Sequence, residues 1–263
     1  MEITLVGTGT GTPSIRRNPA CVLFKLGNKN AVFDSGPGTI RGLLAAGVDY
    51  TNIDIIFYTH LHLDHVSDFS AILFAAKIPP ETRKRPLRVY GPSGLKAYYK
   101  HITELYGDTV CSDSYKLLLE EIANKDIDID GFRVSTKTLE HHDGGMGYRV
   151  TEPGGKVAVY TGDTDYCEAA VGLSRKADIL IAECSFPDEI KMKGHLTPSS
   201  AARLANEADV KKLVLVHMYP VCDSYDLISC CKKTFAGEVI VGEDMMKLEL
   251  IGRHKSAALD YTD

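Results

Sequence analysis

The sequence predicts an α/β fold from three observations. Short apolar runs rich in β-branched residues, such as 53–58 and 177–182, alternate with stretches of helical periodicity. A chain of 263 residues can bury a large core. No repeat, low-complexity region or flexible linker divides it. We therefore expect one domain over 1–252, followed by a poorly ordered C-terminal tail over 253–263.

Composition and charge argue against several classes of protein. With 30 lysines and arginines against 35 acidic residues, the net charge is −5, so the overall field does not favour non-specific nucleic-acid binding, although a local basic patch is allowed. The longest wholly apolar run, 71–76, is far shorter than the roughly 20 residues that span a bilayer. Residues 1–4 do not resemble a signal peptide. We expect no membrane association.

The seven cysteines form an odd set without a C-x-x-C pair. Reduced thiols explain such a set most simply, so we expect a cytoplasmic protein. Cys167 and Cys184 fall near loops that carry candidate site residues, where a thiol can approach a metal. We favour buried, inert thiols at both positions, since free cysteines are usually buried.

The first predicted strand, 3–6, runs into a glycine-rich loop over 7–13. This loop does not complete the G-x-G-x-x-G fingerprint of dinucleotide-binding proteins, and Pro13 opposes the helix that should follow. We expect the loop to shape the rim of a site, since glycines let the backbone approach a ligand closely. Arg16 and Arg17 follow, and for them contact with an anionic substrate and simple solvation are equally good interpretations.

Two strands, 20–26 and 30–33, are predicted to form a hairpin. The second strand leads to Asp34, in the segment Asp34-Ser35-Gly36-Pro37-Gly38. By itself this aspartate is typical of a plain turn. A short helix over 39–46 follows, and Gly47 closes it.

Four side chains that can bind a metal follow the apolar strand 53–58 within six residues: His60, His62, Asp64 and His65. Alternate residues of an extended chain share a face, so the imidazoles of His60 and His62 can reach one ion. Asp64 and His65 come where the chain turns into a helix, predicted over 67–77, and there they can face a second ion. Such nitrogen and oxygen donors suit a borderline-soft divalent cation, most simply zinc.

The most basic stretch is 83–88, which leads into a predicted strand over 87–90. Contact with a phosphate backbone is one interpretation, and a solvated loop is the one that we favour. A helix is predicted from Gly94 to about Tyr106. We expect the polar stretch from there to about Lys125 to be helical as well.

Further strands are predicted over 131–140, 146–151, 156–160, 177–182 and 212–216. A helix over 199–208 has Thr197 as N-cap and Pro198 as its first residue. Ligand-type side chains recur at the C-terminal ends of four predicted strands: His60, His141, Asp163 and His217. Strand ends are where sheets present ligands, so this recurrence predicts one shared site.

Three motifs give the sequence a family resemblance. The segment from Thr59 to His65 resembles the H-x-H-x-D-H signature of the metallo-β-lactamase superfamily, and Asp34 to Gly38 resembles its D-x-G-x-G element. The segment from Gly194 to Thr197 resembles the H-x-T element of the ribonuclease Z-like branch. The similarity covers the chain from Thr8 to about Pro220. It implies a four-layer αββα sandwich, in which Asp34 supports the metal loop without binding metal.

The resemblance also implies two divalent metal ions, most simply zinc, with iron or manganese as alternatives. One ion would take His60, His62 and His141, the other would take Asp64, His65 and His217, and Asp163 would bridge them. His141 is favoured over His142 because the family pattern places a glycine six residues after the ligand, as Gly147 is here. His142 stays an alternative, since a bulge can shift the register by one residue.

The implied chemistry is phosphodiester hydrolysis by a hydroxide that bridges the two ions. Asp64 would bind metal and orient or deprotonate the attacking water. His195 would donate a proton to the leaving oxygen or bind a non-bridging oxygen. Capping of the following helix is the structural alternative for His195.

The sequence identifies the substrate less specifically than it identifies the type of reaction. Only 21 residues lie between His141 and Asp163, which leaves no room for the basic arm that relatives use to bind transfer RNA. We therefore expect a small or single-stranded phosphodiester and disfavour transfer RNA. Alternatives are hydrolysis of another ester (aryl sulfate, thioester or lactone) and a non-catalytic metal-binding or oxygen-sensing module. Relatives of this kind also favour a homodimer.

Overall fold

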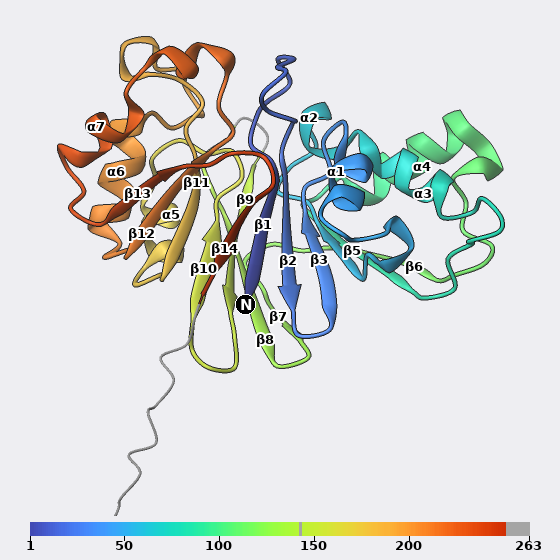
Figure 1. Ribbon diagram of the computed structural model, residues 1–263. Coiled ribbons are helices and arrows are strands. Elements are labelled where there is room, and N and C mark those ends of the chain that lie inside the picture. The colour runs from blue at the N-terminus through green and yellow to red at the C-terminus, as the bar shows by residue number, and fades with distance from the viewer. Residues whose placement is uncertain (142–143, 251–263) are drawn as a thin grey trace, which may run out of the picture.

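Two seven-stranded sheets lie face to face at the centre of the protein, whose computed structural model describes residues 1–141 and 144–250 (Figure 1). The first sheet contains, in spatial order, β14 (Met246–Glu249), β1 (Glu2–Gly7), β2 (Cys21–Leu26), β3 (Lys29–Phe33), β4 (Ile55–Phe57), β5 (Leu87–Gly91) and β6 (Leu117–Glu121). The second contains β13 (Glu238–Val241), β12 (Lys212–Val216), β11 (Ile179–Glu183), β10 (Val157–Tyr160), β9 (Met146–Thr151), β8 (Phe132–Thr138) and β7 (Asp126–Ile129).

Helices cover the outer face of each sheet (Figure 1). The first sheet is flanked by α1 (Thr39–Ala45), α2 (Leu63–Val66), α3 (Asp68–Ala75) and α4 (Leu95–Tyr106). The second is flanked by α5 (Glu168–Ser174), α6 (Pro198–Glu207) and α7 (Leu227–Lys232). The predicted αββα sandwich is therefore confirmed. Thr197 caps α6 and Pro198 begins it, as the sequence predicts.

The strand sequences are apolar on both faces because both faces of each sheet are covered. Along β2, Val22 and Phe24 point into the layer between the sheets, whereas Cys21 and Leu23 lie under the helices. Strand β11 divides in the same way, with alternate residues in the central layer and under α5 and α6. Successive side chains of a strand point to opposite faces, and both faces are covered, so these strands are continuous apolar segments in the sequence.

Aromatic side chains from the two sheets pack against one another close to the loop that carries His60. Phe33 stacks on Phe57 in the first sheet with ring centroids 4.8 Å apart, and it meets the ring of Tyr148 from the second sheet at 5.2 Å. The Tyr148 hydroxyl donates to the carbonyl of Tyr58 at 2.6 Å, immediately before the loop that carries His60. The position of that loop is thus fixed from both sheets.

One prediction about local structure is confirmed and one is wrong. The helix expected over 67–77 is α3, and a separate short helix, α2, precedes it, so that Asp64 lies in the first turn of α2. The stretch to Lys125 is not continuously helical: after a short 3₁₀ turn at Gly107–Thr109 it forms β6, which pairs in parallel with β5. Pairing with a neighbouring strand, which local periodicity does not record, decides the structure of β6.

The C-terminal part of the chain adds elements that the sequence did not predict. Strand β14 pairs antiparallel with β1, with Ile3 opposite Leu248, and β13 extends the second sheet beside β12. The expected tail over 253–263 and the boundary at 252 lie outside the described residues. Across 1–141 and 144–250, no helix combines the length and apolarity that a membrane crossing requires.

Arg83 belongs to the interior, and the expectation of a solvated basic stretch is wrong for it. Its side chain is buried and donates to three backbone carbonyls, of Arg85, Thr51 and Pro86, at 2.7 to 2.8 Å. Its guanidinium also lies 5.4 Å from the centre of the Tyr115 ring. Arg83 therefore fixes the connection that leads into β5.

We predict that Arg83→Ala lowers the free energy of unfolding by about 3 kcal/mol, because buried carbonyls lose their donors. Urea denaturation followed by circular dichroism measures the change. The matched control is Arg88→Ala, whose exposed side chain should contribute about 0.5 kcal/mol or less. Equal denaturation midpoints for the two variants would contradict the structural role of Arg83.

Candidate metal centre

The four strand-end residues meet at one edge of the sandwich. His60, His141 and Asp163 each lie three residues beyond their strands, β4, β8 and β10, and His217 directly follows β12. These strands come from both sheets, and their C-terminal ends open onto the same side. The structure thus brings these four positions together at one edge.

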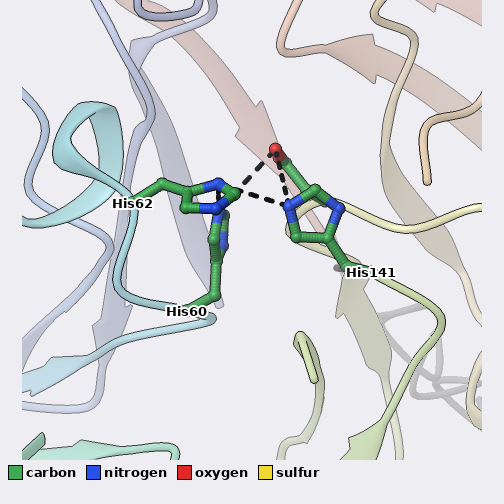
Figure 2. A group of neighbouring side chains, drawn as sticks. His60, His62 and His141 are labelled. Atoms are coloured by element: carbon green, nitrogen blue, oxygen red, sulfur yellow. Dashed lines mark hydrogen bonds and ion pairs between the residues drawn. The ribbon is translucent and has the colours of Figure 1, made fainter. Parts of the chain in front are cut away.

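His60, His62 and His141 form the first group of possible ligands (Figure 2). His62 Nδ1 lies 3.0 Å from His60 Nε2 and 3.3 Å from His141 Nε2. One carboxylate oxygen of Asp163, Oδ2, lies 3.8 Å and 3.9 Å from the same two Nε2 atoms. Three imidazoles and one carboxylate thus surround a common point.

Asp64, His65 and His217 form the second group. The Nε2 atoms of His65 and His217 lie 3.1 Å apart, and Asp64 Oδ2 lies 3.5 Å from His217 Nε2. The other oxygen of Asp163, Oδ1, is 3.4 Å from His65 Nε2 and 3.3 Å from His217 Nε2. Asp163 therefore offers one oxygen to each group.

The distances fit cations. Four ligands at 2.0–2.1 Å from a tetrahedral zinc ion lie about 3.3 Å from one another, close to the nitrogen–nitrogen distances in both groups. Asp163 Oδ1 is buried and has no hydrogen-bond donor among the described residues. A buried carboxylate oxygen without a donor is costly unless a cation balances it.

Hydrogen bonds on the outer side of the rings set which nitrogen is free. His65 Nδ1 donates to Asp34 Oδ2 and His141 Nδ1 to the carbonyl of Gly194, both at 2.9 Å. His60 Nδ1 lies 3.0 Å from Thr59 Oγ1, whose own hydrogen goes to Asp34. With Nδ1 protonated, each ring presents the Nε2 lone pair inward, which is the form that binds a metal.

Asp34 ties the two sheets to the metal loop. It accepts from the backbone N–H of Thr59 at 2.8 Å, from His65, and from the Tyr160 hydroxyl at 2.9 Å. Its backbone has φ +60, an unusual value for a residue other than glycine. It lies outside both groups of possible ligands, as the resemblance implies for a supporting aspartate.

Electrostatics favour ionised carboxylates at the centre. Burial raises the pKa of Asp163, but His217 and His65 outweigh burial and hold that pKa well below its usual value. Burial also raises the pKa of Asp64, but the contact between Asp64 and His217 outweighs burial and lowers that pKa below its usual range. Both groups are therefore acceptors near neutral pH.

His195 lies beside both groups and is oriented by Glu183, which the sequence did not single out. His195 Nδ1 is 3.0 Å from Glu183 Oε1, and its ring centre lies 5.1 Å from that of His141. Burial lowers the pKa of His195, but the Glu183 carboxylate outweighs it and raises the pKa above the usual value. Thr197, not His195, caps α6, so the structural alternative for His195 is wrong.

Ser185 connects these residues to the second group. Its hydroxyl donates to Glu183 Oε2 at 2.6 Å and accepts from Nδ1 of His217 at 3.0 Å. Glu183 is the last residue of β11, at the same edge as the predicted ligands. Its place at a strand end was the one signal that could have identified it from sequence.

The glycine-rich loop after β1 reaches the site, as predicted for a rim. The backbone N–H of Gly11 donates to Asp64 Oδ2 at 2.8 Å. Arg17 is buried and donates to Thr8 Oγ1 and to the carbonyl of Gly242, so solvation is wrong for it, whereas contact with a substrate stays a prediction. Arg16 is exposed and lies 3.4 Å from Asp223.

The remaining sequence candidates lie apart from the two groups. Cys167 and Cys184 are buried, as expected, and burial raises the pKa of the Cys184 thiol well above its usual value. All seven cysteines fall within the described residues and none is paired. His142, the alternative to His141, lies outside the described residues.

Comparisons with known proteins agree with this geometry. The sequence profile described as Beta-lactamase superfamily domain matches residues 29–218, more than half of the chain. A protein named Ribonuclease Z from Archaeoglobus fulgidus is 30% identical over a 307-residue alignment that covers 95% of this chain and 97% of the relative.

Solved structures share the whole fold. The short form of human tRNase Z superposes with a TM-score of 0.79 at 26% identity, covering 95% of this chain and 100% of that chain. The metallo-beta-lactamase fold protein YhfI from Bacillus subtilis has a TM-score of 0.81 at 24% identity, covering 94% and 98%, and supports the fold alone. The chain belongs to the beta-lactamase superfamily, in its ribonuclease Z-like branch of metal-dependent hydrolases.

Proposed function

We propose that the protein is a dinuclear phosphodiesterase within a single domain over 1–252. The observation that carries this proposal is the position of Asp163 between two groups of ligands, with one oxygen facing each. His60, His62 and His141 would hold one ion, and Asp64, His65 and His217 the other. Zinc suits these donors best, and iron or manganese is also compatible. When bound, two such ions supply a hydroxide near neutral pH and positive charge for the transition state.

Asp64 is proposed to orient the attacking water and accept its proton as well as to bind metal. Its lowered pKa keeps it ionised, and the Gly11 N–H fixes one of its oxygens at 2.8 Å. Asp64 also lies in the first turn of α2, and this position favours its ionised form because helix N-termini stabilise negative charge. A held, ionised carboxylate can accept a hydrogen bond from the attacking water and so orient it.

His195 is proposed to donate a proton to the leaving oxygen. Its Nδ1 is engaged by Glu183, which leaves Nε2 as the nitrogen available to substrate. The carboxylate also favours the protonated ring, as a proton donor requires. Glu183 acts through His195 and is a positioning residue.

We propose a small or single-stranded phosphodiester as substrate. Relatives named Ribonuclease Z support the phosphodiester. Strands β9 and β10 are joined by a turn over 152–156, with no arm among the described residues between His141 and Asp163. The 307-residue alignment exceeds this chain's 263 residues, so the relative carries segments absent here. Transfer RNA remains disfavoured on these grounds.

Assays on a parallel panel of substrates distinguish this proposal from its alternatives. Turnover of an aryl sulfate, thioester or lactone without turnover of phosphodiesters would favour the other hydrolases. A redox-active di-iron centre without any hydrolysis would favour a sensing module. The homodimer and the cytoplasmic location stay predictions, and unpaired thiols are compatible with the second.

The purified protein is expected to contain about two metal ions per chain, as measured by elemental analysis. Chelation should lower the melting temperature because the ions bind the folded chain and offset repulsion among inward-facing lone pairs. His101→Ala, which removes an exposed histidine on α4, is the control that should keep full occupancy. One ion or none at saturating metal would contradict the two-ion assignment.

Asp64→Ala is expected to reduce hydrolysis of bis(p-nitrophenyl) phosphate by about 10²-fold or more, since it removes both a ligand and the proposed proton acceptor. Circular dichroism should show an intact fold. Asp108→Ala, on an exposed turn, is the matched control and should retain activity. Full activity of Asp64→Ala would refute the mechanism.

Glu183→Gln is expected to move the basic limb of the pH–kcat/KM profile to lower pH. Because Glu183 raises the pKa of His195, its removal lowers that pKa, and the proton donor is then lost at lower pH as the pH rises. His195→Gln should abolish this limb. An unchanged limb in both variants would show that His195 is not the donor.

A further inference from the structure

Two aromatic rings, Phe186 and Tyr219, stack on each other beside the metal centre. Their centroids lie 4.4 Å apart with an angle of 18° between the planes. They follow the neighbouring parallel strands β11 and β12, in which Glu183 pairs with Val216. Each ring therefore lies three residues beyond a paired position, and the Tyr219 N–H donates to the carbonyl of Ser185 at 3.3 Å. The register of the strands brings the rings together.

Each ring also meets an imidazole of the site. Phe186 packs edge to face with His195 at 6.0 Å and 74°. Tyr219 does so with His217 at 6.4 Å and 86°. The pair is thus continuous with the centre, on the side of the proposed proton donor.

The two rings are not part of the hydrophobic core. Neither belongs to the three buried apolar clusters, and both are half-buried, so part of each reaches solvent. Among the described residues, no hydrogen-bond partner is found for the Tyr219 hydroxyl. Tyr58, Tyr148 and Tyr160, by contrast, each have a hydrogen-bonded hydroxyl.

We propose that Phe186 and Tyr219 form a stacking platform for a nucleobase of the substrate, next to the scissile phosphate. The inference rests on the proposed phosphodiesterase function and names its substrate class: a nucleotide phosphodiester. A half-buried aromatic face binds the π-face of any base, so the platform selects for a base without selecting its identity.

The base belongs to the leaving nucleoside, because Phe186 contacts His195. In the reaction, the oxygen of water bonds to phosphorus and the bond from phosphorus to the leaving oxygen breaks. The leaving oxygen takes the proton from His195, and the water proton passes to Asp64. A base held against Phe186 would fix the leaving oxygen within reach of that imidazole.

The test compares the dinucleotide UpU with two analogues, each of which lacks one base. Chromatography identifies which nucleoside leaves. The wild-type enzyme should show a KM about tenfold or more higher for the analogue without the leaving base, with a smaller effect for the other. Phe186→Leu and Tyr219→Leu should raise KM for UpU toward that of the abasic analogue, with a larger change for UpU than for the analogue. Tyr219→Phe should keep the preference.

Phe74→Leu, which removes an exposed ring on α3, is the matched control and should keep both KM values. Equal KM values for UpU and both analogues in the wild type, with hydrolysis intact, would overturn the platform alone. Equal losses on base-bearing and abasic substrates in the Phe186 and Tyr219 variants would also overturn it, because the pair would then only support the imidazoles. No hydrolysis of these substrates or of bis(p-nitrophenyl) phosphate would overturn the proposed function itself.

Discussion

Asp163 is almost completely buried, and its two oxygens face imidazole nitrogens on opposite sides. Among the described residues, Oδ1 has no hydrogen-bond donor. Ring nitrogens of the surrounding imidazoles face one another at about 3 Å. In the metal centre that we propose, cations would balance the carboxylate and accept the ring lone pairs. Much of the surrounding fold holds these side chains in place.

That arrangement depends on contacts from both sheets. Asp34, at the end of β3, holds His65 and the backbone of Thr59, while the Tyr160 hydroxyl reaches it from β10. On the other side, Ser185 and Glu183 orient His217 and His195. The packing of the two sheets therefore sets the protonated nitrogen and the direction of each ring. Fold stability and the chemistry of the centre share the same hydrogen bonds.

Much of the fold was predictable because strand periodicity and turn residues are local. The hairpin of β2 and β3, the cap of α6 and the strand β12 follow from a few neighbouring residues each. The predictions failed where a distant partner decides the conformation. β6 forms a strand because β5 pairs with it, and Arg83 and Arg17 are buried because carbonyls from distant parts of the chain accept from them.

Which side chains can meet at the centre was predictable from local sequence, because residues that follow strands of a layered sheet emerge at the same edge. His60, His141, Asp163 and His217 were identifiable in that way. Three relations became visible only in the folded protein: Asp163 offers one oxygen to each group, Glu183 engages His195, and Phe186 stacks on Tyr219. Those relations join residues far apart in the chain, and their geometry is set by the packing of two sheets rather than by local spacing.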